Sequence, residues 1–201
     1  MQPYRDTLFA MKKANGGEWS QPEKIGHAPF DLAGVKKYLA YDTRAGVTHM
    51  VYVSYPYFGR AETLYYANSD SPGWQPVKID SLSEEQNAEY HSLAMAFDSL
   101  GNVHLAWHVD FDSIGYQWYR VMYANNSTGE WVKQQVSPSI FLGGMGSGLT
   151  QFSVQRNGVA HILYFDQAYC GLDCESSYVR NDSLNSTSWI TDTIQRPSRP
   201  L

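Results

Sequence analysis

A tyrosine and a histidine, Tyr90 and His91, stand side by side just before an apolar stretch. The chain is built from repeated units, and no other unit has a histidine at this place. An unrepeated polar residue in a repeat array tends to be functional. Either side chain could take a proton from a polyuronate sugar while the cation of Arg60 holds the sugar carboxylate. We therefore select Tyr90, His91 and Arg60 as candidate catalytic residues; the alternative is an ordinary exposed loop histidine.

Two aspartates, Asp110 and Asp112, follow the next apolar stretch. As a pair they could cleave a glycosidic bond, or they could bind Ca²⁺ together with backbone carbonyls. The alternative is a solvated acidic loop. They belong to a wider set of aromatic and acidic side chains, which suits sugars because rings stack on C–H faces and carboxylates accept from hydroxyls. The predicted ligand-binding set is Tyr55, Tyr57, Asp110, Asp112, Tyr116, Asp166 and Tyr169.

The two cysteines, Cys170 and Cys174, lie four positions apart. This spacing favours a small disulfide that closes a loop, and two thiols are the alternative. A zinc site would need two further ligands nearby, and none lies at the spacing of a zinc finger. Apart from Ca²⁺ at the aspartates, the sequence predicts no metal or cofactor.

A repeat supplies the elements that must position these residues. Tryptophan recurs at Trp19, Trp74, Trp131 and Trp189, with spacings of 55, 57 and 58 residues. Three units also share the pattern Gly-x-x-His-x-x-(Tyr/Trp). Its histidines are His49, His104 and His161.

The repeated histidines and tryptophans are interpreted as structural. A catalytic or metal site does not need one copy per unit, whereas a packing contact does. We expect each imidazole to bond a backbone group of a neighbouring strand. Each indole should anchor its unit by packing while its N–H reaches the turn.

Each full unit predicts four antiparallel strands separated by Gly- and Asn-containing turns. The best-preserved unit gives strands at Ser92–Phe97, Val103–His108, Gln117–Ala124 and Trp131–Val136. Four-stranded sheets repeated radially form a β-propeller. We predict one all-β domain over residues 1–201, with a half blade at 7–25 and blades at 35–79, 91–136 and 149–194. Three and a half blades do not close a ring, so the remaining blades are expected in a longer chain.

The units resemble the BNR, or Asp-box, propeller repeats, whose turn motif is Ser-x-Asp-x-Gly-x-x-Trp. Ser69 to Trp74 is the nearest copy, with a shorter Gly–Trp spacing. The stretch from Phe97 to Trp107 is similar to repeats of secreted bacterial propellers, some of them polysaccharide lyases and surface proteins. The resemblance implies a sialidase-like fold and a secreted or cell-surface location. It does not imply a sialidase, because that family uses three arginines and only Arg60 is well placed here.

The composition of the chain disfavours two classes of binding partner, nucleic acid and the membrane interior. The net charge is −5 and no basic patch is present, which disfavours nucleic acid. No apolar run is long enough to span a membrane, so membrane insertion is not expected. The sequence therefore predicts a propeller module that binds carbohydrate or another surface ligand. The alternatives are part of a polysaccharide-degrading lyase or hydrolase, and a scaffold for protein–protein contact.

Overall fold

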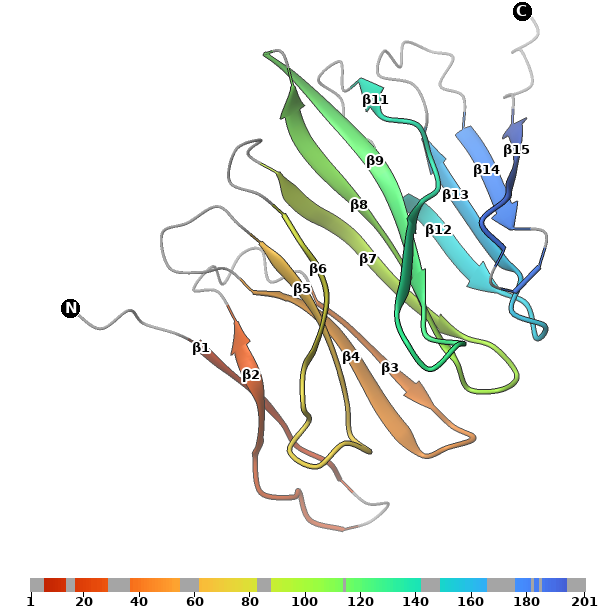
Figure 1. Ribbon diagram of the computed structural model, residues 1–201. Coiled ribbons are helices and arrows are strands. Elements are labelled where there is room, and N and C mark those ends of the chain that lie inside the picture. Colours follow the sequence, from red (N-terminus) through yellow and green to blue (C-terminus); the bar gives the residue numbers. More distant parts are fainter. Residues whose placement is uncertain are drawn as a thin grey trace, which may run out of the picture. The chain divides into compact units, whose positions relative to one another are not determined.

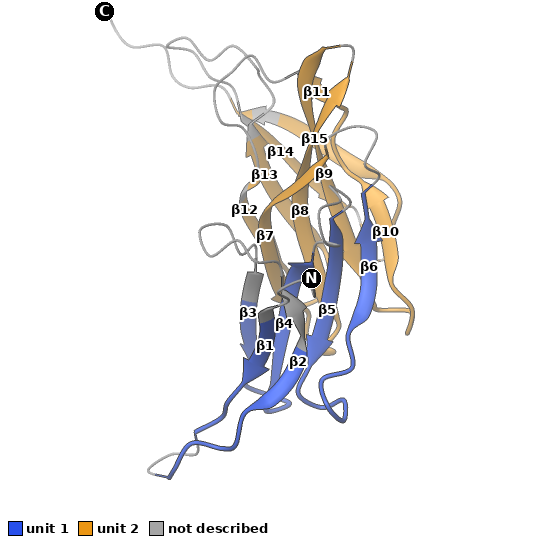
Figure 2. Ribbon diagram, turned by 90° about the vertical axis from the view of Figure 1, so that its left-hand side faces the viewer, with its two compact units in different colours: residues 1–84 blue, residues 85–201 orange. Residues whose placement is uncertain are grey.

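The chain folds entirely into strands and turns wherever its structure is described (Figure 1). The computed structural model describes residues 6–13, 17–28, 37–54, 62–82, 88–113, 115–141, 149–165, 176–181, 183–184 and 186–194. Within these ranges no residue is helical. The chain divides into two compact units, Met1–Glu84 and Glu85–Leu201 (Figure 2).

Unit 1 contains two antiparallel sheets. The first is a pair of strands, and the second has four strands that neighbour one another in sequence order. Their bounds are β1 (Asp6–Ala10), β2 (Glu23–Ala28), β3 (Lys37–Asp42), β4 (Val47–Ser54), β5 (Thr63–Asn68) and β6 (Val77–Ser81). The two sheets share a core, in which Ile25 of β2 packs with Met50 and Tyr52 of β4.

Unit 2 also contains two antiparallel sheets, again with strands in sequence order. One runs through β7 (Glu89–Phe97), β8 (Val103–Ser113), β9 (Tyr116–Asn125) and β10 (Val132–Gln135), with the short β11 (Ile140–Phe141) also pairing with β9. The other runs through β12 (Leu149–Val154), β13 (Ala160–Phe165), β14 (Ser176–Asn181) and β15 (Trp189–Ile194). They pack face to face, with Ala106 and Tyr123 of one sheet in the same buried cluster as Ile162 and Tyr164 of the other.

The second strands of two sheets, β4 and β8, are buried on both faces over most of their length. In β4 every residue from His49 to Val53 is buried, and in β8 every residue from Val103 to Val109 is buried. By contrast, β10 leaves Val132, Lys133 and Gln135 exposed, which suits the polar outer strand of a sheet.

The strands around the candidate residues are longer than predicted. β7 begins at Glu89 rather than Ser92, and β8 runs to Ser113 rather than His108. Residues 89–91 and 108–112 alternate between polar and apolar side chains, which is the pattern of a strand with one buried face. The predicted loop positions of Asp110 and Tyr116 were therefore wrong, because these residues lie in β8 and β9.

The repeated histidines are structural, but their partner differs from the expected backbone group. Nδ1 of each ring bonds a tyrosine hydroxyl on the next strand, at 2.6 Å for His49–Tyr66 and for His104–Tyr123. His161 makes the same bond with Tyr178. In each case the tyrosine lies two residues before the direct cross-strand partner of the histidine, so the two rings are diagonal neighbours on one face.

These imidazoles are held neutral. Burial lowers the pKa of His49 and of His104, even though the carboxylates of Asp42 and Asp98 act in the opposite direction. Burial and the nearby Arg180 lower the pKa of His161. A neutral imidazole whose Nδ1 is hydrogen-bonded to a tyrosine hydroxyl contributes to packing and does not act as an acid at neutral pH.

Two of the repeated tryptophans, Trp74 and Trp189, have a different partner from the one expected. The indole N–H of Trp74 donates to Oε2 of Glu23 at 3.1 Å, and that of Trp189 donates to Oε1 of Gln134 at 3.1 Å. Glu23 and Gln134 lie on β2 and β10, the last strand of the preceding sheet. Each of these indoles thus ties one sheet to its predecessor, instead of reaching its own turn.

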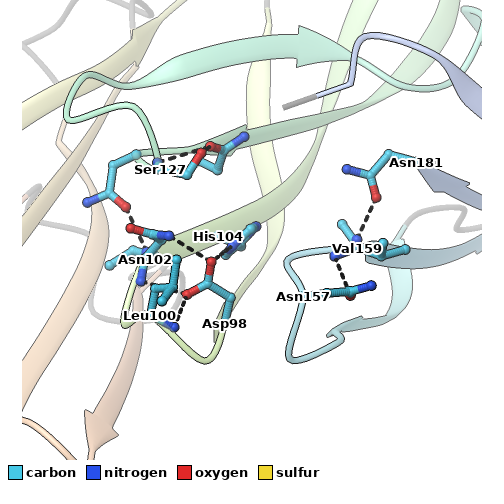
Figure 3. A network of polar contacts seen from close by, with 12 residues as sticks. Asp98, Leu100, Asn102, His104, Ser127, Asn157, Val159 and Asn181 are labelled. Atoms are coloured by element: carbon cyan, nitrogen blue, oxygen red, sulfur yellow. Dashed lines mark hydrogen bonds and ion pairs between the residues drawn. The ribbon is translucent and has the colours of Figure 1, made fainter. Parts of the chain in front are cut away.

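The turn between β7 and β8 is organised by one buried carboxylate (Figure 3). Asp98 accepts hydrogen bonds from the amides of Leu100 and Asn102 at 2.9 Å, and from Nδ2 of Asn102 at 2.7 Å. Nε2 of His104 lies 3.5 Å from Oδ2 of the same carboxylate. Gly101 closes the turn with a φ of 88°, which explains the glycine at this place.

A tyrosine-to-phenylalanine change tests the histidine–tyrosine pair. Tyr123→Phe is expected to lower the free energy of unfolding by about 1–3 kcal/mol, because the fully buried His104 loses the partner of its Nδ1. Tyr178→Phe is the matched control. His161 is only half-buried, so water can replace the lost hydroxyl and the change should cost less. Urea denaturation gives both values, and equal losses would contradict this account.

Candidate functional site

Pairing between β7 and β8 brings an unrepeated group of ionisable side chains together. Glu89 lies opposite Asp110, and His91 lies opposite His108. Direct partners in antiparallel strands point to the same face of the sheet, and so do residues two apart on one strand. The side chains of Glu89, His91, His108 and Asp110 therefore share one face at one end of these strands.

Three of these residues form a compact cluster, named here the His91 cluster: His91, His108 and Asp110. Nε2 of His91 lies 3.5 Å from Oδ2 of Asp110, and Nε2 of His108 lies 3.3 Å from Oδ1. The two imidazoles are nearly parallel, with ring centroids 5.1 Å apart. Oε2 of Glu89 also lies 3.5 Å from Nε2 of His91.

The cluster runs from the surface into the core. His91 has 36% of its side chain exposed, Asp110 has 18%, and His108 has 4%. Tyr119 of β9 packs edge-on against the ring of His108. A ligand from solvent can therefore contact His91, whereas Asp110 and His108 lie deeper and hold the His91 ring in place.

The tautomer of His108 follows from a contact with the neighbouring sheet. The amide N–H of Leu149, at the start of β12, donates to Nδ1 of His108 at 3.3 Å. An accepting nitrogen carries no proton, so the neutral ring is protonated at Nε2, which faces Asp110. The contact fixes His108 and leaves Asp110 between two imidazoles.

The backbone beside His91 is irregular. The β7–β8 register shifts between His91 and Ala94, and Ser92 has a φ of 47°, in the left-handed region that favours glycine. A β-bulge of this kind re-aims the side chains next to it. Backbone strain at a non-glycine residue is also common at functional sites. Both observations single out this end of β7.

Tyr90 and His91 are not brought together, although they are adjacent in sequence. Tyr90 pairs with Val109 and its side chain is fully buried on the opposite face of the sheet. Successive residues of a strand point to opposite faces, so the proposed Tyr–His pair would need a break in the strand there. The structure places His91 with His108 and Asp110 instead.

The other predicted residues lie near the cluster or outside the described part of the chain. Asp112 is exposed and shares its face with Asp110, whereas Tyr116 is 58% exposed and pairs with Ser113 on the other face. The following predicted residues lie outside the described part of the chain: Tyr55, Tyr57, Arg60, Asp166, Tyr169, Cys170 and Cys174.

His108 is the residue that the sequence analysis missed. It lies four residues after His104, and the same position of the other units holds Val53 and Phe165. A histidine where the repeat otherwise has an apolar residue is the same kind of exception that selected His91. Comparing every position of the repeat would have found it.

Comparisons with known proteins add no assignment: no family model matches the chain, and no curated protein matches it. Among the described residues, no helix is long and apolar enough to cross a membrane. The inference of function therefore depends on the side chains of the site.

Proposed function

We propose that the protein is a secreted or cell-surface β-propeller module of the BNR type, and that it binds carbohydrate at the end of β7 and β8. The repeat supports the propeller, because each sheet has its strands in sequence order and tryptophans bond the preceding sheet. The resemblance to secreted propellers supports the location.

One observation carries the proposed binding function: side chains that do not recur from unit to unit gather at one accessible place. His91 is half-exposed between Glu89 and Asp110, and the exposed Asp112 follows on the same face. Carboxylates accept from vicinal sugar hydroxyls, and an imidazole both donates and accepts. This combination suits a polar ligand with many hydroxyl groups.

Glycan binding tests this proposal. The full chain is screened on a glycan array, and the affinity for a bound glycan is measured by titration calorimetry. His91→Ala and Asp112→Asn are each expected to weaken binding by about 10- to 100-fold, the effect of losing a hydrogen bond to a charged or polar group. Glu130→Gln, in an exposed turn at the other end of β9, is the control and should leave the affinity unchanged. Unchanged affinity in both site variants would contradict the proposed surface.

A second candidate function is polysaccharide cleavage, favoured by the contact between His91 and Asp110. A carboxylate beside an accessible imidazole can orient it and stabilise its protonated form, so His91 can act as a general base toward a uronate sugar. Turnover of uronate polysaccharides by the wild-type protein, lost in His91→Ala, is the expected result. Retained turnover in that variant would eliminate this candidate. A chain that neither binds nor cleaves glycans would favour the scaffold alternative.

A further inference from the structure

We propose that His91, His108 and Asp110 form a binding site for a transition-metal ion of the Zn²⁺ type. This proposal goes beyond carbohydrate binding and does not depend on it, because it concerns only the donor atoms of the cluster. One potential ligand atom from each of the three residues lies within 4.8 Å of the other two. Two histidines and one carboxylate leave a coordination position open for water or a ligand.

The distances from Asp110 to the two imidazoles are close to those between the ligands of a zinc ion. Ligand atoms bound to Zn²⁺ at its usual bond lengths in a tetrahedron are about 3.4 Å from one another. The contacts of Asp110 are 3.5 Å to Nε2 of His91 and 3.3 Å to Nε2 of His108. The two imidazoles approach different oxygens of the carboxylate, so binding at one ion requires a rotation of His91, whose side chain is 36% exposed.

The carboxylate has an unmet requirement that an ion would satisfy. Oδ1 of Asp110 is buried, and no hydrogen-bond donor reaches it in good geometry within the described residues. His108 Nε2 is close at 3.3 Å but is not aligned for a hydrogen bond. A buried carboxylate oxygen without a donor is unfavourable. A cation held jointly with the two imidazoles would remove this deficit.

Binding requires a change at His108. Its Nδ1 accepts from the Leu149 amide, so Nε2 carries the proton in the neutral ring. Coordination through Nε2 by the neutral ring requires this proton to move to Nδ1, which can then no longer accept from the Leu149 amide. Metal binding is thus expected to alter the amide of Leu149, on the adjacent sheet of unit 2.

The donor set selects the class of metal. Imidazole nitrogens suit Zn²⁺, Cu²⁺, Ni²⁺ and Fe²⁺, whereas Ca²⁺ prefers six to eight oxygen ligands. The cluster supplies two nitrogens and one carboxylate, so it favours Zn²⁺ over the Ca²⁺ that the paired aspartates suggested. Oε2 of Glu89 lies 3.5 Å from the same Nε2 of His91, so this carboxylate adds negative charge beside the ion.

Zinc titration of the full chain tests the site. The protein is prepared without a polyhistidine tag, stripped with a chelator and titrated with Zn²⁺ in the absence of glycan. One ion per chain is expected. Each of His91→Ala, His108→Gln and Asp110→Asn should weaken binding at least about a hundredfold, since loss of even a residue that only holds a metal ligand in place can cost that much. Glu130→Gln, in the exposed turn at the other end of β9, is the control and should bind zinc as the wild type does.

Two outcomes overturn the metal site. The first is unchanged zinc affinity in the His91, His108 and Asp110 variants. The second adds a loss of zinc binding in Cys170→Ser/Cys174→Ser to that result, which would assign the ion to the cysteines. Paramagnetic Co²⁺ added to wild-type protein needs no variant: it should shift the ring resonances of His91 and His108 and the amide of Leu149. Shifts confined to other histidines would contradict the proposal. Glycan binding measured in chelator is scored separately, so either proposal can fail alone.

Discussion

Replacing Trp74 with alanine is expected to lower the free energy of unfolding of unit 1 by about 3–5 kcal/mol. The indole is 1% exposed and packs with Ile25, Met50 and Tyr52, which join the two sheets of this unit. It also lines an apolar pocket of about 440 Å³. Deletion of the ring would enlarge this pocket and remove the contacts of the indole with the core between the two sheets.

Trp19 provides the matched control, since it occupies the same position of the repeat but is 58% exposed. Trp19→Ala should change the free energy of unfolding by about 0.5 kcal/mol or less. Glu23→Ala removes the acceptor of the Trp74 indole and should cost about 1 kcal/mol. Urea denaturation of the three variants separates packing from hydrogen bonding. Equal effects of Trp74→Ala and Trp19→Ala would mean that burial does not decide the role of the repeated tryptophan.

The strands and turns could be predicted from the repeat because its residues meet local requirements of backbone conformation and burial. Gly101 marks a turn that needs a positive φ, and the apolar residues on both faces of β4 and β8 mark strands buried on both sides. The structural role of His104 followed from its recurrence. Its partner did not, because a diagonal contact with Tyr123 depends on the register of two strands, and register is a property of the folded sheet.

The candidate site was predictable only in part, for a related reason. His91 was identified because it departs from the repeat. Its spatial neighbour was not identified, because Tyr90 is adjacent to it in sequence whereas His108 is its partner on the neighbouring strand. The polar residues at the start of β7 and at the end of β8 suggested loops in the sequence. The alternation of polar and apolar residues that identifies these positions as strand extends over only a few residues. Once Glu89 to His91 and His108 to Asp112 are read with a period of two, the shared face of the cluster follows.

Asp98→Ala is expected to lower the free energy of unfolding of unit 2 by about 2–4 kcal/mol at neutral pH. Asp98 is 2% exposed, and its carboxylate accepts three hydrogen bonds from Leu100 and Asn102. Burial opposes its ionisation, but these hydrogen bonds and the nearby His104 prevail and hold the pKa of Asp98 below its usual value. The exposed Asp192→Ala, in the same unit, is the control and should have little effect.

The sign of the pH dependence follows from that lowered pKa. In the unfolded chain Asp98 takes up a proton near its usual pKa of 3.8, whereas in the folded protein it stays ionised to lower pH. Its contribution to stability is therefore complete well above pH 3.8 and is lost as the pH falls through the folded pKa. Urea denaturation at a series of pH values should show wild type and Asp98→Ala converging in acid. Asp98→Asn keeps an acceptor for the two amides but presents an NH₂ group to Asn102, so its smaller deficit should also shrink in acid. A wild-type advantage that stays constant from neutral pH to below pH 3 would show that the charge of Asp98 does not stabilise this turn.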